Sequence, residues 1–194
     1  EAQEVIRKRC KKIQANLYEV GRQIKYCKGK NSFLIRGLKN DYKNLRLNLL
    51  GGHQVANAAL AVGLVEGLSF HGFNLKACAI RQGLYNAVWP GRCEVVGRNP
   101  LIILDGAQNL ASAQVLKNAI RDNFGTASGG KYRKLILVLG ISQDKDLRGI
   151  CKELEPIAQE IILTQSNNPR AASVDTLKTL FNNKEIISLT SNVK

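Results

Sequence analysis

The sequence predicts an α/β protein in which a mostly parallel sheet is flanked by helices. In the second half of the chain, short and nearly continuous apolar runs alternate with helix-like segments, which is typical of a parallel sheet. The first half instead carries short segments of alternating apolar and polar residues, typical of antiparallel strands, followed by two helix patterns. The pattern changes at the turn 88–91 (VWPG), so we predict two domains, 1–88 and 89–194.

The first domain is predicted to begin with the end of a charged surface helix at residues 4–14. Short strands are predicted at residues 17–20, 24–26, 32–36 and 45–49. Two helices follow, an Ala-rich one at 54–68 and a second one at 74–85, because apolar residues recur there at helical spacing.

The second domain is predicted to alternate strands with helices. Its strands are residues 101–104, 135–139, 161–163 and 186–189, and its helices are residues 112–123, 147–154 and 174–181. Ligands of such sheets bind beyond the carboxyl ends of the strands. The polar loops 105–109, 140–146 and 164–170 are therefore the candidate binding loops.

Composition narrows the class of protein. The 194 residues are 44% hydrophobic and contain no apolar run of membrane-spanning length. Five scattered cysteines without a Cys-x-x-Cys pair, and only two histidines, predict a reduced, cytoplasmic protein without a structural metal. Residue 1 is Glu and no signal peptide is visible, so we expect a piece of a longer protein.

The net charge is strongly positive. There are 29 Lys and Arg against 15 Asp and Glu, a formal charge of +14. A basic domain attracts polyanions such as nucleotides, polycarboxylates or nucleic acid, although a solvated basic surface is an equal alternative. The charge is spread along the chain without interleaved aromatic residues, which disfavours a nucleic-acid partner.

The segment 89–109 holds the sharpest functional signal. Arg92 stands in a Pro-Gly turn, and Asp105 follows an apolar strand pattern. A guanidinium offers paired donors to phosphate, and a carboxylate at the end of a strand accepts from ribose hydroxyls. The pair predicts a mononucleotide site. The alternatives are an ordinary surface arginine for Arg92 and a helix N-cap for Asp105.

Five motifs in one order carry a family resemblance. They are LGGHQVANAA at 50–59, WPGRCE at 89–94, DGAQN at 105–109, LGISQDKD at 139–146 and NPRAA at 168–172. With these motifs the chain resembles the folylpolyglutamate synthase / dihydrofolate synthase family of the Mur-type ligases. The resemblance covers most of the chain.

The resemblance implies the organisation of the chain. Residues 1–88 would be the C-terminal part of a P-loop-type ATPase domain, and residues 89–194 most of a Rossmann-like glutamate-ligase domain, truncated at its end. The chain has no Gly-x-x-x-x-Gly-Lys-Ser/Thr loop. Residues 28–32 (KGKNS) are superficially similar to one, and we interpret them as a hairpin turn. We expect no ligase activity from these residues alone.

The resemblance also implies a reaction. ATP phosphorylates a carboxylate of folate or dihydropteroate, and the amine of L-glutamate attacks the acyl phosphate. Such chemistry depends on neutralising charge around the transferred phosphoryl group. The expected partners are ATP, L-glutamate and folate or dihydropteroate, with Mg²⁺ held by residues upstream. We expect a monomer, with no nucleic-acid or membrane partner.

Three residues match the family's ATP site. Arg92 matches the arginine at the phosphates and is the predicted catalytic residue. Asp105 matches the ribose-binding aspartate. Asn57 matches the asparagine at the adenine, where an amide both donates and accepts; its alternative is a buried asparagine that satisfies backbone groups.

Five further residues are candidates for lining the site. His53 and Gln54 begin the Ala-rich helix, although His53 fits equally well as a simple helix-start residue. Gln108 stands where the family usually has histidine, so a role that needs positive charge is in doubt there. Asn109 follows it. Lys145 matches a lysine loop near the amino-acid substrate and would hold a glutamate carboxylate, or simply pair with its neighbouring aspartates.

Two other functions remain open at this stage. One is a Mur-type ligase for another amino acid or peptide-like substrate, because the nucleotide motifs would look alike. The other, from a different class, is a basic α/β module that binds nucleic acid. The sequence does not distinguish a dihydrofolate synthase from a folylpolyglutamate synthase.

Overall fold

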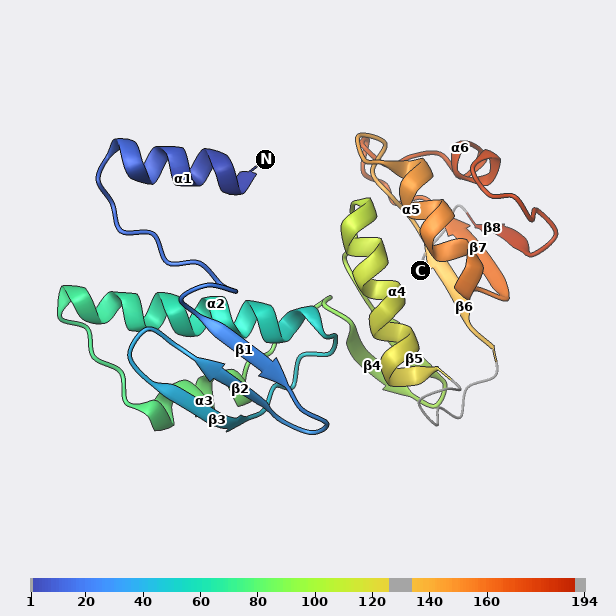
Figure 1. The fold of residues 1–194 in the computed structure, drawn as a ribbon. Helices are drawn as coiled ribbons and strands as arrows, with labels where there is room; N and C mark the ends of the chain where they lie inside the picture. Colours follow the sequence, from blue (N-terminus) through green and yellow to red (C-terminus); the bar gives the residue numbers. More distant parts are fainter. Residues whose placement is uncertain (1, 126–133, 191–194) are drawn as a thin grey trace. The chain divides into compact units, whose positions relative to one another are not determined.

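The computed structural model describes residues 2–125 and 134–190, drawn in Figure 1. The chain divides into two compact units, Glu1–Val88 and Trp89–Lys194. Each unit has its own cluster of buried hydrophobic residues. The α/β class predicted from the sequence is confirmed.

The first unit contains a small antiparallel sheet and three α-helices. Its elements are α1 (Ala2–Lys12), β1 (Lys25–Lys28), β2 (Phe33–Arg36), β3 (Asp41–Leu45), α2 (His53–Leu68), the 3₁₀ helix η1 (Ser69–His71) and α3 (Ala77–Tyr85). The strands lie in the order β1-β2-β3. The predicted hairpin turn joins β1 to β2, where the N–H of Gly29 donates to the carbonyl of Ser32 at 2.8 Å.

The core of this unit lies between the sheet and helices α2 and α3. Ile35, Tyr42 and Leu45 from the strands pack with Ala59 and Val62 of α2, and all five are at most 2% exposed. Burial of these side chains is the main favourable term that holds α2 on the sheet.

One predicted strand of this unit is wrong. Residues 17–20 form no strand, and only Val20 makes an isolated bridge, to Ile24. The chain turns instead, because the carbonyl of Glu19 accepts from Ile24 N–H at 3.2 Å and Gly21 adopts a φ of 95°. Glycine reaches that conformation without steric cost.

The third strand lies earlier than predicted. We expected 45–49, whereas β3 is Asp41–Leu45. Asn44 adopts a φ of 57°, and Tyr42 and Leu45, three residues apart, both enter the core. The alternation that identifies a strand in a sequence is therefore broken within β3.

The second unit contains a hairpin and a parallel sheet. Its elements are β4 (Glu94–Arg98), β5 (Leu101–Leu104), α4 (Leu110–Phe124), β6 (Ile136–Leu139), α5 (Leu147–Leu154), the 3₁₀ helix η3 (Glu155–Ile157), β7 (Glu160–Thr164), α6 (Val174–Thr179) and β8 (Ile187–Thr190). Strands β6, β7 and β8 are parallel neighbours in that order.

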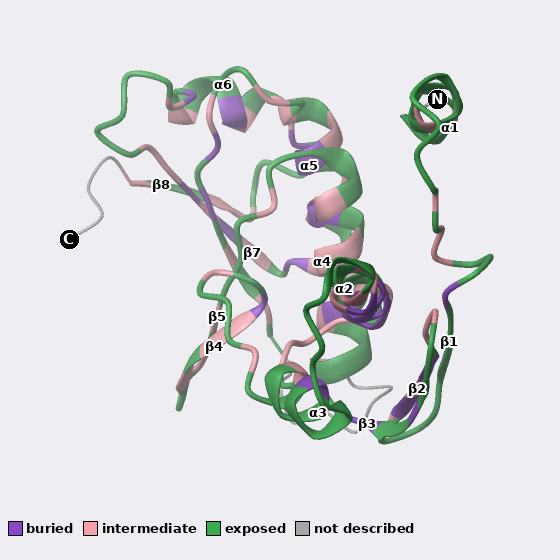
Figure 2. Cartoon of the chain, turned by 90° about the vertical axis from the view of Figure 1, so that its left-hand side faces the viewer, coloured by how far each residue is buried: buried purple, intermediate pink, exposed green. Residues whose placement is uncertain are grey.

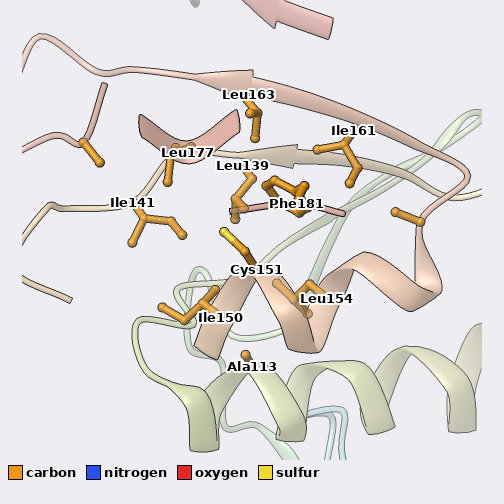
Figure 3. Packing of buried hydrophobic residues seen from close by; sticks show 12 residues of the cluster. Ala113, Leu139, Ile141, Ile150, Cys151, Leu154, Ile161, Leu163, Leu177 and Phe181 are labelled. Carbon is orange, nitrogen blue, oxygen red and sulfur yellow. The ribbon is translucent and has the colours of Figure 1, made fainter. Parts of the chain in front are cut away.

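Helix α5 supplies the centre of the second core. Ile150, Cys151 and Leu154 are at most 1% exposed and pack toward Leu163 of β7 and Leu177 of α6, as Figure 3 shows. The predicted bounds of α5, 147–154, are those observed.

The hairpin corrects one feature of the predicted sheet. We expected 101–104 to join the parallel sheet, but β5 pairs antiparallel with β4, a strand that the sequence analysis missed. Only Asn99 and Pro100 connect the two strands, a length that permits a hairpin and not a parallel crossover. Within the described residues, β6 is bonded to β7 alone.

Of the helices in residues 2–125 and 134–190, none combines the length and apolar character that a membrane crossing requires.

Candidate functional site

The turn before β4 and the loop after β5 are bonded to each other. The N–H of Cys93 donates to Oδ2 of Asp105, and the N–H of Gly106 donates to the carbonyl of Gly91, both at 2.8 Å. The antiparallel register explains why they meet: Glu94 opposes Leu104, so the start of β4 lies beside the end of β5. The structure thus brings residues 91–93 and 105–106 into one candidate site.

The turn itself has an unusual backbone. Gly91 has a φ of 68° and Cys93 a φ of 47°. Positive φ is uncommon for residues other than glycine, and it persists where the surroundings enforce it. Here the N–H of Gly91 is bonded to Oε2 of Glu94 at 2.7 Å, and Cys93 is buried with its N–H held by Asp105. Arg92 is fixed between these two left-handed residues.

The Arg92 side chain is exposed and lies over the loop that follows Asp105. A Cβ atom built on Gly106 would lie 3.7 Å from Nη1 of Arg92. Among the residues that the structure describes, none accepts a hydrogen bond from this guanidinium or forms an ion pair with it. Its paired donors are therefore available to an external anion.

Asp105 has two structural hydrogen bonds and spare capacity. Its Oδ1 accepts from the N–H of Ala107, and its Oδ2 from the N–H of Cys93, both at 2.8 Å. A carboxylate has about four acceptor positions, so an exposed Asp105 can accept further donors such as hydroxyl groups. The alternative in which Asp105 caps the following helix is wrong.

The cap of α4 is Asn109. Its side chain accepts from the N–H of Ser112 at 2.8 Å, and Oγ of Ser112 accepts in return from the N–H of Asn109 at 3.0 Å. This is a reciprocal capping arrangement. The Asn109 side chain is therefore used locally, whereas Gln108 is exposed and its N–H joins the cap through Oγ of Ser112.

The Cys93 thiol is not suited to act as a nucleophile. Burial raises the pKa of Cys93 to about 11, and the negative charge of Asp105 adds to the increase. The thiolate is the reactive form of cysteine. Near neutral pH the Cys93 side chain is therefore protonated and uncharged, and it acts as a small buried apolar group.

The candidates of the first unit lie at the start of α2, which begins at His53. Nδ2 of Asn57 donates to Oε1 of Gln54 at 3.0 Å. Gln54 is buried and Asn57 is exposed, so the alternative of a buried Asn57 is wrong. The exposed amide of Asn57 keeps acceptor capacity on its oxygen.

Lys145 lies in the loop after β6 and pairs with its neighbour. Its Nζ is 3.3 Å from Oδ2 of Asp144, which is also 2.7 Å from Nη2 of Arg170. Desolvation raises the pKa of Asp144, but the hydrogen bonds from Arg170 and Lys145 outweigh it and the pKa lies below its usual value. Among the described residues, neither a hydrogen bond nor an ion pair connects Lys145 to Arg92 or Asp105.

The described residues contain no cluster of three or more His, Cys, Asp or Glu side chains able to hold a metal ion. The groups around Arg92 and Asp105 are instead one guanidinium, the carboxylates of Asp105 and Glu94, and neutral backbone groups.

Two residues of the site were missed by sequence reasoning. Cys93 contributes its backbone N–H, a group that every residue except proline has, so its residue type gave no signal. Glu94 accepts from the N–H of Gly91, and a glutamate two positions after the Pro-Gly-Arg turn was the available signal for it.

Fold and site together define a class: an α/β protein of two units, with a candidate anion site where a hairpin precedes a parallel sheet. Residues 91–193, more than half of the chain, match the family model described as Mur ligase, glutamate ligase domain. The chain belongs to this family, and the resemblance predicted from its motifs is confirmed.

Curated relatives carry matching names. The dihydrofolate synthase/folylpolyglutamate synthase of Mycobacterium tuberculosis is 34% identical over 145 residues, which is 74% of this chain and 28% of the relative. The protein of the same name from Bacillus subtilis is 33% identical over 132 residues, 68% of this chain and 29% of the relative. The chain therefore spans less than a third of these relatives.

Solved structures give the same result. The folylpolyglutamate synthase of M. tuberculosis, complexed with ADP and AMPPCP, superposes with a TM-score of 0.85 and 26% identity, covering 98% of this chain and 43% of that one. The bifunctional synthase of Yersinia pestis, complexed with AMPPNP and a Mn ion, superposes with a TM-score of 0.78 and 28% identity, covering 97% and 42%.

Proposed function

We propose that this chain is part of an ATP-dependent ligase that joins L-glutamate to folate or dihydropteroate. Its family and the names of its relatives support this activity. In the proposed reaction ATP transfers its terminal phosphoryl group to the substrate carboxylate. The amine of glutamate then attacks the acyl carbon, and inorganic phosphate leaves as the amide forms.

The observation that carries the proposal is the pairing of an unengaged guanidinium with an anchored carboxylate. Arg92 lies over the loop that begins at Asp105, and the two segments are tied by two hydrogen bonds. We assign Arg92 to the ATP phosphates, where its donors offset the charge of the phosphoryl group. We assign Asp105 to the ribose hydroxyls.

The remaining assignments are part of the same proposal. Asn57 would contact the adenine, and His53 and Gln54 would line the site. Lys145, already beside Asp144, would attract a glutamate carboxylate, and Gln108 would offer hydrogen bonds without a charge. Residues 1–88 would belong to the ATPase domain, in a cytoplasmic, monomeric enzyme. Mg²⁺ would supply charge neutralisation at the phosphates, with its ligands from outside these residues.

Trp89 provides the test. It is the only tryptophan in the sequence, it is 65% exposed, and it lies three positions before Arg92. Its fluorescence should report the binding of AMPPCP or ADP to the 194-residue chain. Arg92→Ala should weaken that binding by about tenfold or more, because a hydrogen bond to a charged group contributes about 1.5–3 kcal/mol.

Arg98→Ala is the matched control. Arg98 is also an exposed arginine, and it is the last residue of β4, at the end away from the turn that holds Arg92. Its loss should leave nucleotide affinity unchanged. If Arg92→Ala binds nucleotide as tightly as the unaltered chain, the assigned role of Arg92 is wrong.

A further inference from the structure

The hairpin between β1 and β2 places a lysine at the start of α2. Lys28 is the last residue of β1 and opposes Phe33, whose side chain is buried in the core beside α2. Residues that oppose each other across two antiparallel strands lie on the same side of the sheet, so the Lys28 side chain extends toward α2. A Cβ atom built on Gly52, the residue before this helix, would lie 3.5 Å from Nζ of Lys28.

Glycines shape both segments of this contact. The N–H of Gly29 donates to the carbonyl of Ser32 at 2.8 Å, and a Cβ atom on Gly29 would lie 2.9 Å from that same oxygen. A larger residue does not fit there unless the turn moves. On the other side of the contact, Gly51 has a φ of 105°, a conformation that glycine adopts without steric cost. The ammonium group of Lys28 therefore lies between two turns that glycine makes possible.

The charge of Lys28 is not compensated within its own unit. Figure 2 shows that β1 is exposed along its length. Within residues 2–125 and 134–190, no carboxylate lies within ion-pair distance of the Lys28 ammonium. Asp41 is the only acidic residue between positions 20 and 65, and it pairs with Arg36 at 3.8 Å. The three N–H donors of Lys28 are therefore available to an external anion.

The second unit contains the same kind of arrangement. There Arg92 lies over the glycine that follows Asp105, the residue assigned to the ribose. In the first unit Lys28 lies over the glycine five positions before Asn57, the residue assigned to the adenine. Five positions of an α-helix span about 7.5 Å along its axis. A nucleotide covers a similar distance from its base to its first phosphate.

We propose that Lys28 is a second cation of the nucleotide site and pairs with a phosphate group of the bound nucleotide. This inference rests on the proposed function, in which Asn57 contacts the adenine. An ammonium group is a compact point charge with donors and no acceptor, so it recognises the anionic part of the ligand more strongly than the neutral base. The chemical class that Lys28 selects is therefore a phosphorylated nucleoside.

Lys25 is the matched control for Lys28. It lies in the same strand and carries the same charge, but it opposes the exposed Arg36, so its side chain extends from the face of the sheet away from α2. Loss of either lysine changes the net charge equally. The comparison therefore separates a local phosphate contact from the general attraction of anions to a chain with a formal charge of +14.

The test is isothermal titration calorimetry of the 194-residue chain with ADP and with adenosine, which carries no phosphate. At low ionic strength Lys28→Ala should weaken ADP binding about tenfold, because hydrogen bonds to charged groups are the strong ones. Lys28→Arg should retain most of the affinity, and Lys25→Ala should bind ADP as the unaltered chain does. Adenosine should bind all four proteins equally. Urea unfolding should show the variants as stable as the unaltered chain, because both lysines are exposed.

Each outcome decides the proposal. A loss of ADP affinity in Lys28→Ala that Lys25→Ala does not share, with unchanged affinity for adenosine, supports it. Unchanged ADP affinity in Lys28→Ala overturns it, as does an equal loss in the two alanine variants or an equal loss toward ADP and adenosine. If adenosine binds too weakly to measure, salt decides. The difference between Lys28→Ala and the unaltered chain should then disappear toward about 1 M salt, and a constant difference overturns the proposal.

The result is separable from the test of the proposed function. If Arg92→Ala binds nucleotide weakly and Lys28→Ala binds it normally, the proposed function stands and this inference fails. If Lys28→Ala alone is weakened, the inference stands and the assigned role of Arg92 fails. A chain that does not bind ADP contradicts both.

Discussion

Cys93 and Asp105 are joined by a hydrogen bond of 2.8 Å from the backbone N–H of the first to Oδ2 of the second. The bond ties a turn with two left-handed residues to the loop after β5, and it holds Arg92 beside that loop. Asp105 therefore has a structural role in addition to the ligand role proposed for it. Its substitution should affect both stability and binding, and the two effects have to be measured separately.

We predict that Asp105→Ala destabilises the chain without any ligand present. The N–H groups of Cys93 and Ala107 lose their acceptors, and that of Cys93 belongs to a buried residue. A buried donor left unsatisfied costs about 1–3 kcal/mol in the free energy of unfolding. Urea unfolding measures the loss. Asp105→Asn retains one oxygen acceptor and should lose less; equal stability of Asp105→Ala and the unaltered chain would contradict the prediction.

The cysteines should differ widely in reactivity. Cys27 and Cys78 are exposed, whereas burial raises the pKa of Cys93 to about 11 and that of Cys151 to about 12. Because only the thiolate reacts, iodoacetamide at mildly alkaline pH should label Cys27 and Cys78 first and leave Cys93 and Cys151 unmodified in the folded chain. Mass spectrometry of digested samples identifies the labelled sites. Early labelling of Cys93 would show that the turn around it opens.

Local signals explain which parts of the fold were predictable. Helix α5 was predicted with its observed bounds as a helix-like segment between two apolar runs, and the structure shows in addition that Asp146 caps it. Strand β4 was missed because Gly97 and a register shift interrupt its alternation, and its identity depends on pairing with β5. Pairing between strands is a tertiary property that composition of one segment does not specify.

The same distinction applies to the candidate site. Arg92 and Asp105 were identified from residue type and position, and they do lie in one pair of bonded segments. Their roles toward a nucleotide stay predictions. The positive φ of Cys93 and the capping role of Asn109 were not predicted, because both depend on backbone geometry that the residue types alone permit but do not require.

The role of Glu66 was also not predicted from the sequence. Its substitution should lower the free energy of unfolding. Its carboxylate is 4% exposed and accepts from the N–H groups of Lys39 and Asn40 at 3.1 and 3.0 Å and from the hydroxyl of Tyr42 at 2.9 Å. Glu66→Gln replaces one acceptor oxygen with an amide that faces donors. We expect a loss of roughly 2–4 kcal/mol in the free energy of unfolding.

Tyr42→Phe is the control for that measurement. It removes one hydrogen bond to Glu66 and keeps the ring in the core, so about 1 kcal/mol should be lost. Burial, and then the hydrogen bond to Glu66, raise the pKa of Tyr42, so its hydroxyl remains a donor at neutral pH. If Glu66→Gln and Tyr42→Phe unfold at the same urea concentration, the carboxylate does not organise the loop before β3.

The ion pair between Lys117 of α4 and Glu153 of α5 should make stability depend on pH. The hydrogen bond from Lys117 lowers the pKa of Glu153 below its usual value, against the opposing effect of desolvation. A carboxyl group whose pKa is lower in the folded state contributes stability above its unfolded pKa, and that contribution is lost as the pH falls through the folded pKa. Lys117→Met should therefore unfold at lower urea concentration than the unaltered chain at neutral pH, and the difference should shrink as the solution is acidified. A difference that stays constant across that range would mean that Lys117 acts through packing of its methylene groups and not through its charge.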